Sequence, residues 1–406
     1  MNTISLSSTR KAVGLGLLVL LGALTAFDSI AIDMYLPAFQ AMEDDLHLRP
    51  GAMQMSLSVF LMGLAVGQAV SGPLVDSLGR RGPLLAGIIL FGAASAMAAL
   101  ATNIHLLMIG RFIQGLGGAA GLVIPRAIVS DLYDAKEATR IFTFLIQIQS
   151  ISPIAAPLLG GLLLGLWGWP SIFWILVMLA ALALLFSLIV IPETLPAESR
   201  AKLTAGNVAK NYWQVLKNRR FLGMSLSAGL VMGTLFGYIS ASSFIFMTYF
   251  NFSASNYSLI FAVNSIGMIL AGQLNFFLCA RMSTRRNLVL GFTVHLIFLI
   301  ALLAAVIIGL NSPLVIGSLL FLATSSICLI LGGITAESMY SVEHSRAGSA
   351  SALLGVLQYA IGGGAGLVLG LVHDGTLFPV ALVMTACSAL AVLFWALAGR
   401  KKPAHI

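Results

Sequence analysis

The sequence predicts an all-α integral membrane protein whose twelve transmembrane helices form two six-helix bundles related by an internal repeat. Three observations lead to this fold class. The mean hydropathy is +1.00 and only 9% of the residues are charged, which excludes an ordinary soluble domain. Twelve apolar stretches follow one another along the 406 residues. The Lys and Arg residues gather in every second gap between these stretches, as in multi-pass membrane proteins.

Each apolar stretch is close to the ~20 residues that a helix needs to cross a bilayer. Lipid offers no partner to backbone N–H and C=O groups, so spans of this length are expected to be helices. The first span is too long for the core of a signal peptide and is followed by others, so we expect no cleavage. The predicted spans are 12–36, 53–75, 82–101, 106–130, 141–166, 170–192, 220–249, 256–279, 288–309, 313–336, 348–371 and 378–399.

The distribution of basic residues predicts the orientation of the chain. Of the 22 Lys and Arg residues, nineteen lie in the two tails and the even-numbered gaps, and only Arg49 lies in an odd-numbered gap. Positive loops remain in the cytoplasm, so both termini are expected there. Anionic lipid accounts for the formal net charge of +8 better than nucleic acid does. Arg111 and Arg126, the last two basic residues, lie inside spans.

The longest polar stretch divides the chain into two halves of six spans each. We expect an N-terminal bundle at 1–192, a cytoplasmic central loop at 193–219 and a C-terminal bundle at 220–406. Four residues of span two recur in span eight at an offset of 200, which supports a parallel duplication with a polar path between the halves. The matched pairs are Ser58 and Ser258, Gly67 and Gly267, Gly72 and Gly272, and Leu74 and Leu274.

The loop between spans two and three contains the pattern G-x-L-x-D-x-x-G-R-R. Gly72 and Gly79 allow a tight reversal of the chain, and Asp76 lies just ahead of a helix start, where an anion is favoured. Arg80 and Arg81 are cytoplasmic cations, and composition alone is consistent with a solvated loop. The spacing resembles the signature loop of the major facilitator superfamily. That resemblance implies a conformational gate formed by these five residues.

An arginine and an aspartate are predicted to meet near the outer ends of their spans. Arg111, in span four, lies about 7–8 Å inside the membrane, and Asp33, in span one, about 4–5 Å inside. Charges inside a span normally face a cavity or a partner, so we expect the two side chains to pair. The surrounding L-x-x-x-R-F-x-Q-G resembles the fourth-span motif of the same superfamily, which implies a role in proton transfer.

Asp28 is the carboxylate expected closest to the bilayer midplane, about 12 Å from the outer end of span one. Asp28 and Asp33 are five residues apart, so they point in different directions from one helix. We expect one to face the central cavity and the other a neighbouring helix, and both are candidates to carry the proton. A structural hydrogen bond between helices is the alternative role for Asp28.

Span five contains two prolines and a pair of glycines in the order P-x-x-x-P-x-x-G-G. Pro153 and Pro157 bend the helix or loosen its hydrogen bonds, while Gly160 and Gly161 allow close helix packing. A packing face is the simpler interpretation of these residues. The arrangement resembles the fifth-span motif of the superfamily's antiporters, which favours export.

Further segments are similar to one branch of this superfamily. The end of span one reads DMYLPAF, the central junction reads IPETLPAESR, and MTYFNFS and FAVNSIGMILAGQLN follow in spans seven and eight. They resemble the bicyclomycin- and chloramphenicol-resistance exporters. The resemblance implies a monomeric, proton-coupled drug exporter of the bacterial inner membrane, with a small amphiphilic, drug-like substrate.

A sparsely polar aromatic pocket is the expected binding site for that substrate. Its candidate residues are Tyr35, Phe236, Tyr238, Asn264, Gln358 and Tyr359. No catalytic residue, metal or cofactor is expected, with the proton as coupling ion. Cys279, Cys328 and Cys387 have no metal-binding or disulfide spacing, and His295 is interpreted as a packed histidine.

Other functions remain as alternatives. A carrier of metabolites such as nucleosides or sugars has the same fold, because a fold does not determine its substrate. An enzyme is disfavoured, since the chain has no H-E-x-x-H, G-x-S-x-G or G-K-[ST] motif. A channel is less expected than a carrier, although selectivity filters need no recognisable motif.

Overall fold

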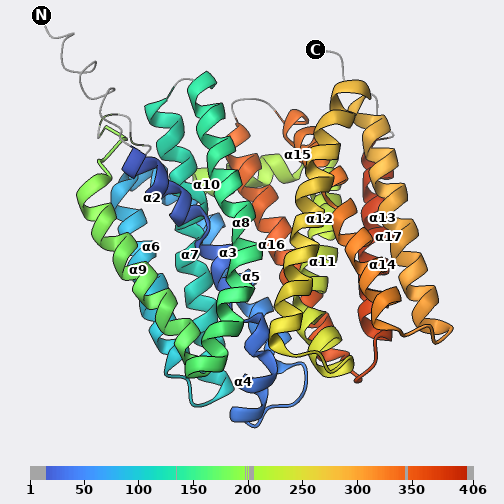
Figure 1. The fold of residues 1–406 in the computed structure, drawn as a ribbon. Coiled ribbons are helices and arrows are strands. Elements are labelled where there is room, and N and C mark those ends of the chain that lie inside the picture. Colours follow the sequence, from blue (N-terminus) through green and yellow to red (C-terminus); the bar gives the residue numbers. More distant parts are fainter. Residues whose placement is uncertain are drawn as a thin grey trace, which may run out of the picture.

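The protein is a bundle of long helices in two halves that lie side by side (Figure 1). The computed structural model describes residues 15–133, 135–196, 198, 200, 205–342 and 346–399, and these contain helices but no strand. Residues 1–14 and 400–406, on which the predicted location of the termini depends, lie outside the described residues. The N-terminal half contains α2 (Leu15–Thr25), α3 (Phe27–Asp33), η1 (Leu36–Ala38), α4 (Phe39–Asp45), α5 (Ala52–Leu78), α6 (Arg81–Ala99), α7 (Ile104–Leu132), α8 (Ala135–Trp167) and α9 (Pro170–Val190).

The C-terminal half begins after a connecting helix, α10 (Ala205–Leu216). It contains α11 (Arg219–Ser243), the π-helical segment η3 (Phe244–Tyr249), α12 (Ala254–Arg281), α13 (Thr284–Ile307), α14 (Pro313–Ser326), α15 (Cys328–Tyr340), α16 (Ala347–Leu371) and α17 (Phe378–Gly399). Within the described residues, ten helices are long and apolar enough to cross a membrane, and the bent pair α2–α4 makes eleven. With α8, whose apolar segment is Ile151–Trp167, the protein has the twelve spans that the sequence predicts.

Polar side chains begin several of these helices where the sequence leaves a loop. Asn103, Asn218, Ser253 and Ser312 each accept a hydrogen bond from a backbone N–H in the first turn of the next helix. These N–H groups have no partner inside the helix, so a side-chain oxygen at this position stabilises the helix start. The observed bounds agree with the predicted spans to within a few residues for this reason.

Span one is broken, although the sequence predicts it as one continuous stretch. Gly16–Thr25 and Phe27–Asp45 are bent by 41° relative to each other. At the break, the N–H of Ala26 donates to Ala23 O at 3.2 Å rather than to Gly22 O, the acceptor that an α-helix would provide. The Oγ1 of Thr25 donates to Gly22 O instead. Side-chain bonding of this kind competes with the helical ladder. The break places Asp28 in the first turn of the new helix α3.

Span ten is also broken, at Ile327, and His295 stabilises the break. The N–H of Ile327 bonds to Thr324 O, which leaves the carbonyl of Ala323 without its usual helical partner. The Nδ1 atom of His295, from α13, lies 3.0 Å from that carbonyl and 2.9 Å from Ser326 Oγ. His295 is fully buried, so the structure agrees with its interpretation as a packed histidine.

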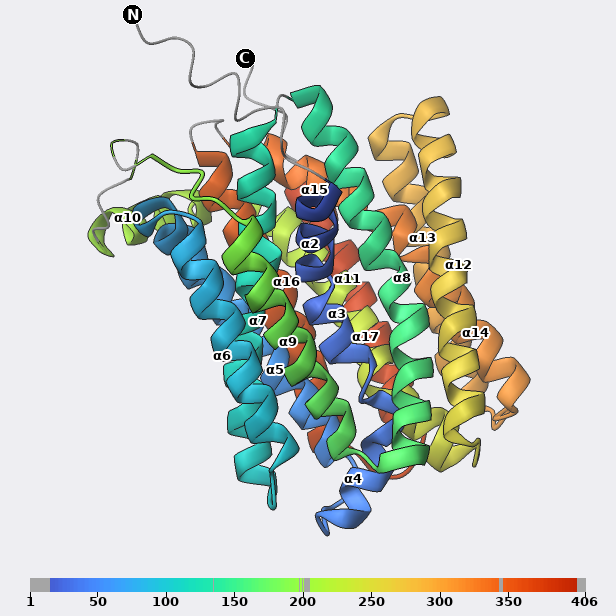
Figure 2. The same cartoon turned by 60° about the vertical axis from the view of Figure 1, so that its left-hand side comes forward.

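The central segment 193–219 is not simply a loop, because it contains the amphipathic helix α10. Its Tyr212 hydroxyl donates to Ala69 O of α5 at 3.2 Å, and Val215 is buried against the C-terminal half. The helix therefore touches both halves at one end of the molecule, which we call the α10 end. The opposite end carries α4, at the bottom of Figures 1 and 2, and we call it the α4 end.

Residues of the predicted repeat occupy equivalent places in the two halves. Gly67 packs on span four, where an added Cβ would meet Ala119, and Gly267 packs on span ten, where it would meet Phe321 and Ser325. Ser58 lies against Gly366 of span eleven, and Ser258 lies against Gly161 of span five. Spans two, four and five correspond to spans eight, ten and eleven. The contacts of span two with spans four and eleven are therefore repeated as contacts of span eight with spans ten and five, as expected of a duplicated bundle. The exact boundaries of the two bundles stay a prediction.

Candidate functional site

A cavity of about 900 Å³ lies between the two halves at the α10 end. Its walls come from α5 and α7 of the N-terminal half, α15 and α16 of the C-terminal half, and α10. The volume suits a drug-sized molecule. At the α4 end the halves close on each other, because α5 and α16 pack through small residues. An added Cβ on Gly370 would lie 3.2 Å from Gly51 O and 2.7 Å from Met55 Cγ.

Asp28 is buried next to this cavity and bonded to the other half. It is 3% exposed, and the hydroxyl of Tyr359, from α16, donates to its Oδ2 at 3.1 Å. Its Oδ1 is buried and has no hydrogen-bond partner among the described residues. Tyr359 lines the cavity, so the phenol that bonds to Asp28 is part of the cavity wall. Sequence reasoning proposed both residues, and the structure brings them together.

Asp33 is the last residue of α3. It is 3% exposed, and among the described residues it has no ion-pair partner within 4 Å. Of the two acids of span one, Asp28 is the one that bonds to the C-terminal half, through Tyr359 of α16.

The predicted pair of Asp33 with Arg111 is wrong for this structure. Arg111 is fully buried, and its Nη2 donates to Ala31 O at 3.1 Å while Nη1 donates to Gln114 Oε1 at 2.5 Å. The Ala31 carbonyl lies in the last turn of α3 and has no helical partner, so a cation is favoured there. The helix ends at Asp33, two residues further on, and no ion pair within 4 Å joins its carboxylate to Arg111.

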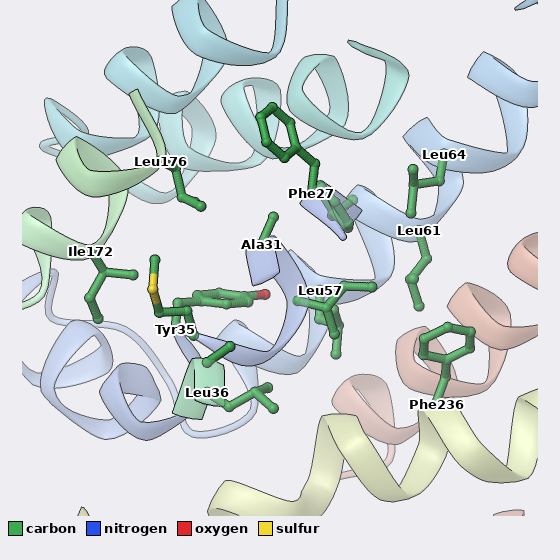
Figure 3. Packing of buried hydrophobic residues seen from close by; sticks show 14 of the residues in the cluster. Phe27, Ala31, Tyr35, Leu36, Leu57, Leu61, Leu64, Ile172, Leu176 and Phe236 are labelled. Atoms are coloured by element: carbon green, nitrogen blue, oxygen red, sulfur yellow. The ribbon is translucent and has the colours of Figure 1, made fainter. Parts of the chain in front are cut away.

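Tyr35 covers the buried guanidinium instead of facing the cavity. The Arg111 Cζ atom lies 4.2 Å from the ring centroids of both Tyr35 and Phe60, a cation–π arrangement. Figure 3 shows the Tyr35 ring in the apolar cluster of the N-terminal half, beside Leu57 and Ile172. Its proposed contact with substrate remains a prediction.

The other candidate pocket residues fall into two groups. Gln358 and Tyr359 line the cavity, and Phe236 lies behind them with its ring 5.7 Å from that of Tyr359. Tyr238 and Asn264 form a second, buried group, in which the Asn264 amide donates to the Tyr238 hydroxyl. This pair lies within the C-terminal half and does not line the cavity.

The predicted gate loop is held together by Arg80. Its guanidinium bonds to Asp76 at 2.8 Å and to Asp131, at the end of α7, at 2.9 Å. Burial lowers the pKa of Arg80, but the two carboxylates raise it more, so its net pKa lies above the usual arginine value. Arg81 donates to Leu188 O of α9 at 2.7 Å. The predicted places of Gly72 and Asp76 are wrong, because Gly72 lies inside α5 with open space around it and Asp76 lies in the last turn of α5 rather than ahead of a helix start. The chain reverses at Gly79, and Arg80 connects α5, α6 and α7.

Glu193 completes this loop from the far end of the half. Its carboxylate accepts the N–H of Arg80 at 2.8 Å and of Arg81 at 3.3 Å, and so caps α6, which has no side-chain cap of its own. Gly79 has φ +91°, and an added Cβ there would strike the Glu193 carboxylate. Only glycine meets both conditions without strain.

The proline-containing helix α8 lies at the boundary between the halves. Ser258 of α12 donates to Pro157 O at 2.9 Å, and Ser265 donates to Pro153 O at 3.4 Å. An added Cβ at Gly160 would overlap the carbonyl of Met34, at the end of span one. The motif thus joins α8 to span one and to the C-terminal half. A bent helix at the boundary between the halves is suited to move during transport. Close helix packing alone would also account for a glycine at position 160.

Sequence reasoning missed three residues of the site. Asp131 and Glu193 bind the gate loop from distant parts of the chain, and no local pattern connects them with it. Arg126 was recognised as a charge inside a span, but no role was assigned to it. It lines the cavity beside Gln68, and its place within an apolar span was the available signal.

Curated relatives match nearly the whole chain. An uncharacterized MFS-type transporter, YdgK, of Bacillus subtilis (strain 168) is 33% identical over 385 residues, covering 93% of this chain and 94% of the relative. A bicyclomycin resistance protein homolog of Haemophilus influenzae is 27% identical, covering 92% and 93%. The multidrug resistance protein MdtL of Escherichia coli is 28% identical, covering 94% and 96%.

Solved structures share the fold. The nucleoside transporter NupG (D323A mutant) aligns with a TM-score of 0.75 at 16% identity, covering 94% of this chain and 99% of that one. A D-xylose–proton symporter aligns with a TM-score of 0.73 at 15% identity, covering 93% and 96%. The family model of the Major Facilitator Superfamily matches residues 20–367. This chain, with its two helical halves and its loop of Asp76 and Arg80, belongs to the major facilitator superfamily of membrane transporters.

Proposed function

We propose that the protein is a proton-coupled exporter of small amphiphilic molecules in the bacterial inner membrane. The observation that carries this proposal is Asp28, a buried carboxylate bonded by Tyr359 across the interface of the two halves. A carboxylate at this place can bind and release a proton. Its partner Tyr359 belongs to the other half, and the two halves move relative to each other during alternating access. Relatives named for bicyclomycin and multidrug resistance support the direction of transport.

The proposed orientation places the α10 end in the cytoplasm. Arg80, Arg81 and Lys217 lie towards that end, whereas Arg49 lies near α4. Positive charge is retained on the cytoplasmic side, so the cavity takes its cargo from the cytoplasm. Alternating access then consists of closing the α10 end and opening the α4 end around the same cargo.

Proton exchange follows from the contacts of span one. When the cavity faces the cytoplasm, loss of the proton from Asp28 leaves a carboxylate held by the Tyr359 hydroxyl. When the α4 end opens, Asp28 or Asp33 takes up a proton from outside. Neutralising the carboxylate weakens its hold on Tyr359 and allows the halves to separate. Arg111 contributes by fixing the end of α3, and the Asp76–Arg80–Asp131 group must rearrange when the α10 end closes.

The proposal is tested in cells and then in vesicles. Bacteria expressing the chain are screened for growth on a panel of anionic, neutral and cationic toxic compounds. A compound that is tolerated is then offered to inside-out vesicles energised by respiration. We expect uptake that saturates and stops when a protonophore collapses the gradient. Resistance without gradient-dependent uptake in the vesicles would contradict the exporter.

A metabolite carrier is the second candidate function. The cavity wall presents the amides of Gln68, Asn211 and Gln358 and several hydroxyls, which suit the hydroxyl groups of sugars and nucleosides. Two transporters of the same fold carry such names, a nucleoside transporter and a D-xylose–proton symporter. Proton-dependent uptake of labelled xylose or uridine by intact cells, with no resistance to any toxic compound, would favour this candidate.

A further inference from the structure

Arg126 is a cation in the cavity wall that forms no ion pair with a carboxylate among the residues that the structure describes. It lies in α7, six residues before the helix ends at Leu132, and its side chain is exposed to the space between the halves. Among the described residues no carboxylate oxygen lies within 4 Å of its guanidinium. Charges inside membrane spans are rare and commonly mark a pathway for ions or substrates.

The nearby acids are each engaged elsewhere. Asp28 interacts electrostatically with Arg126, but it forms no ion pair with it within 4 Å and instead accepts the Tyr359 hydroxyl at 3.1 Å. Asp76 and Asp131 are both bound by Arg80. Asp76 lines the same cavity, but its carboxylate is bound by Arg80. Within the described part of the chain the Arg126 guanidinium has no hydrogen-bond or ion-pair partner, so its donors are available in the cavity.

The surroundings of Arg126 suit an amphiphile with one anionic end. Gln68 and Gln358 supply amide groups, while Val75, Leu122 and Ala127 form an apolar wall. A guanidinium presents paired N–H donors that match the two oxygens of a carboxylate. An anion here accepts these donors, and the apolar part of the same molecule covers the wall.

We propose that Arg126 is an anion-binding subsite and that the cargo is an amphiphile carrying a carboxylate or similar anionic group. This inference rests on the proposed function, because it identifies the substrate class of the same cavity. When such an anion leaves and a proton enters, both movements make the inside of the cell more positive. A membrane potential that is negative inside therefore drives both movements.

Equilibrium binding of three fluorescent probes with one common ring system tests the inference without a proton gradient. Dansylglycine is an anion, dansylamide is neutral and dansylcadaverine is a cation at pH 7.5. We expect the purified full chain to bind dansylglycine about tenfold more tightly than dansylamide, the size of one charged hydrogen bond, and dansylcadaverine most weakly. Equal binding of all three, or a preference for the cation, would overturn the subsite.

Variants assign the preference to the arginine. Arg126→Gln should bind dansylglycine and dansylamide equally, and Arg126→Lys should retain part of the preference, because an ammonium is a point charge. Arg281→Gln, at the exposed end of α12 and outside the cavity, is the matched control and should behave as the wild type. A full preference retained in Arg126→Gln would refute the assignment. If Arg126→Gln does not fold, the wild-type ranking and Arg126→Lys still decide.

The two proposals fail separately. An anion preference that depends on Arg126, with no gradient-driven transport, would contradict the exporter and leave the subsite in place. Gradient-driven export of cations alone, with binding unaffected by Arg126→Gln, would contradict the subsite and leave the exporter in place.

Discussion

At the scale of single residues, Asp28 carries the proposed coupling. Asp28→Asn preserves the shape of the side chain and can still accept the Tyr359 hydroxyl, but it cannot ionise. We expect a folded protein that binds cargo and whose transport no longer responds to a proton gradient, measured in energised vesicles. Asp374→Asn, on the exposed loop before α17, is the control. Normal gradient-driven transport by Asp28→Asn would leave Asp33 as the remaining acid of span one.

Arg111 and Asp33 should behave as independent residues. Because Arg111 bonds to Ala31 O and Gln114 rather than to Asp33, reversing both charges restores no contact. The losses in thermal stability of Asp33→Arg and Arg111→Asp, measured in detergent, should add in the double variant to within about 0.5 kcal/mol. A double variant clearly more stable than that sum would mean that the two side chains pair in a state other than this one.

The burial of Asp28, Asp33 and Arg111 agrees with their places inside predicted spans, but their partners were not predictable. That Asp28 and Asp33 point to different sides of span one stays a prediction from their spacing. Sequence position placed Asp33 and Arg111 at similar depth, and depth alone does not decide which group a side chain reaches. The decisive fact was the end of α3 at Asp33, which frees the Ala31 carbonyl for Arg111. Helix breaks of this kind depend on tertiary packing, so composition does not reveal them.

At the scale of elements, the cap of α6 by Glu193 predicts a dependence of stability on pH. Burial raises the pKa of Glu193, but the N–H groups of Arg80, Leu195 and Arg81 and the charge of Arg200 lower it below the usual value of 4.5. A group whose pKa is depressed in the folded protein stabilises the fold at pH values above its unfolded pKa. This stabilisation is lost as the pH falls through the group's pKa in the folded protein.

Wild type and Glu193→Gln should therefore differ in thermal stability by a constant amount above pH ~5 and converge towards pH 3. Melting curves in detergent from pH 3 to 7 would measure this difference. A stability difference that persists unchanged at pH 3 would mean that the ionised cap does not cause it.

The contact of α5 with α16 predicts a way to bias the conformation. An added Cβ on Gly366 would lie 2.6 Å from Ser58 Oγ, whereas Gly364, two residues away, has open space. Gly366→Leu should wedge the α4 end apart, and Gly364→Leu should not. Labelling rates of a cysteine introduced at Met55, which packs against Gly370 of α16, should rise severalfold in the first variant alone. Equal rates in both variants would mean that this interface does not close the α4 end.

The elements themselves followed closely from sequence, with exceptions that have physical causes. Apolar length and the capping residues Asn103, Asn218, Ser253 and Ser312 set the spans to within a few residues. The breaks at Ala26 and Ile327 were missed because both lie in apolar sequence without proline. Helix α10 was missed because its amphipathic pattern is short and lies in a polar stretch.

At the scale of the whole molecule, a cavity lies between the two halves at the α10 end. The offset repeat predicted equivalent halves, and the environments of Gly67 and Gly267 agree with it. The place of Arg126 in the cavity wall was not predictable, since it required knowing which side of α7 faces the gap between the halves. Substrate recognition therefore emerges from the assembled halves rather than from any one segment.

Counterflow of protons and cargo tests the central claim most directly. Proteoliposomes containing the protein and an internal pH dye are given an outward gradient of the compound that produced the greatest resistance in the growth screen. The account predicts that cargo leaving the liposomes draws protons inward, with acidification that saturates with cargo and is absent in Asp28→Asn. Cargo efflux without proton movement in the wild type, or unchanged proton movement in Asp28→Asn, would contradict it.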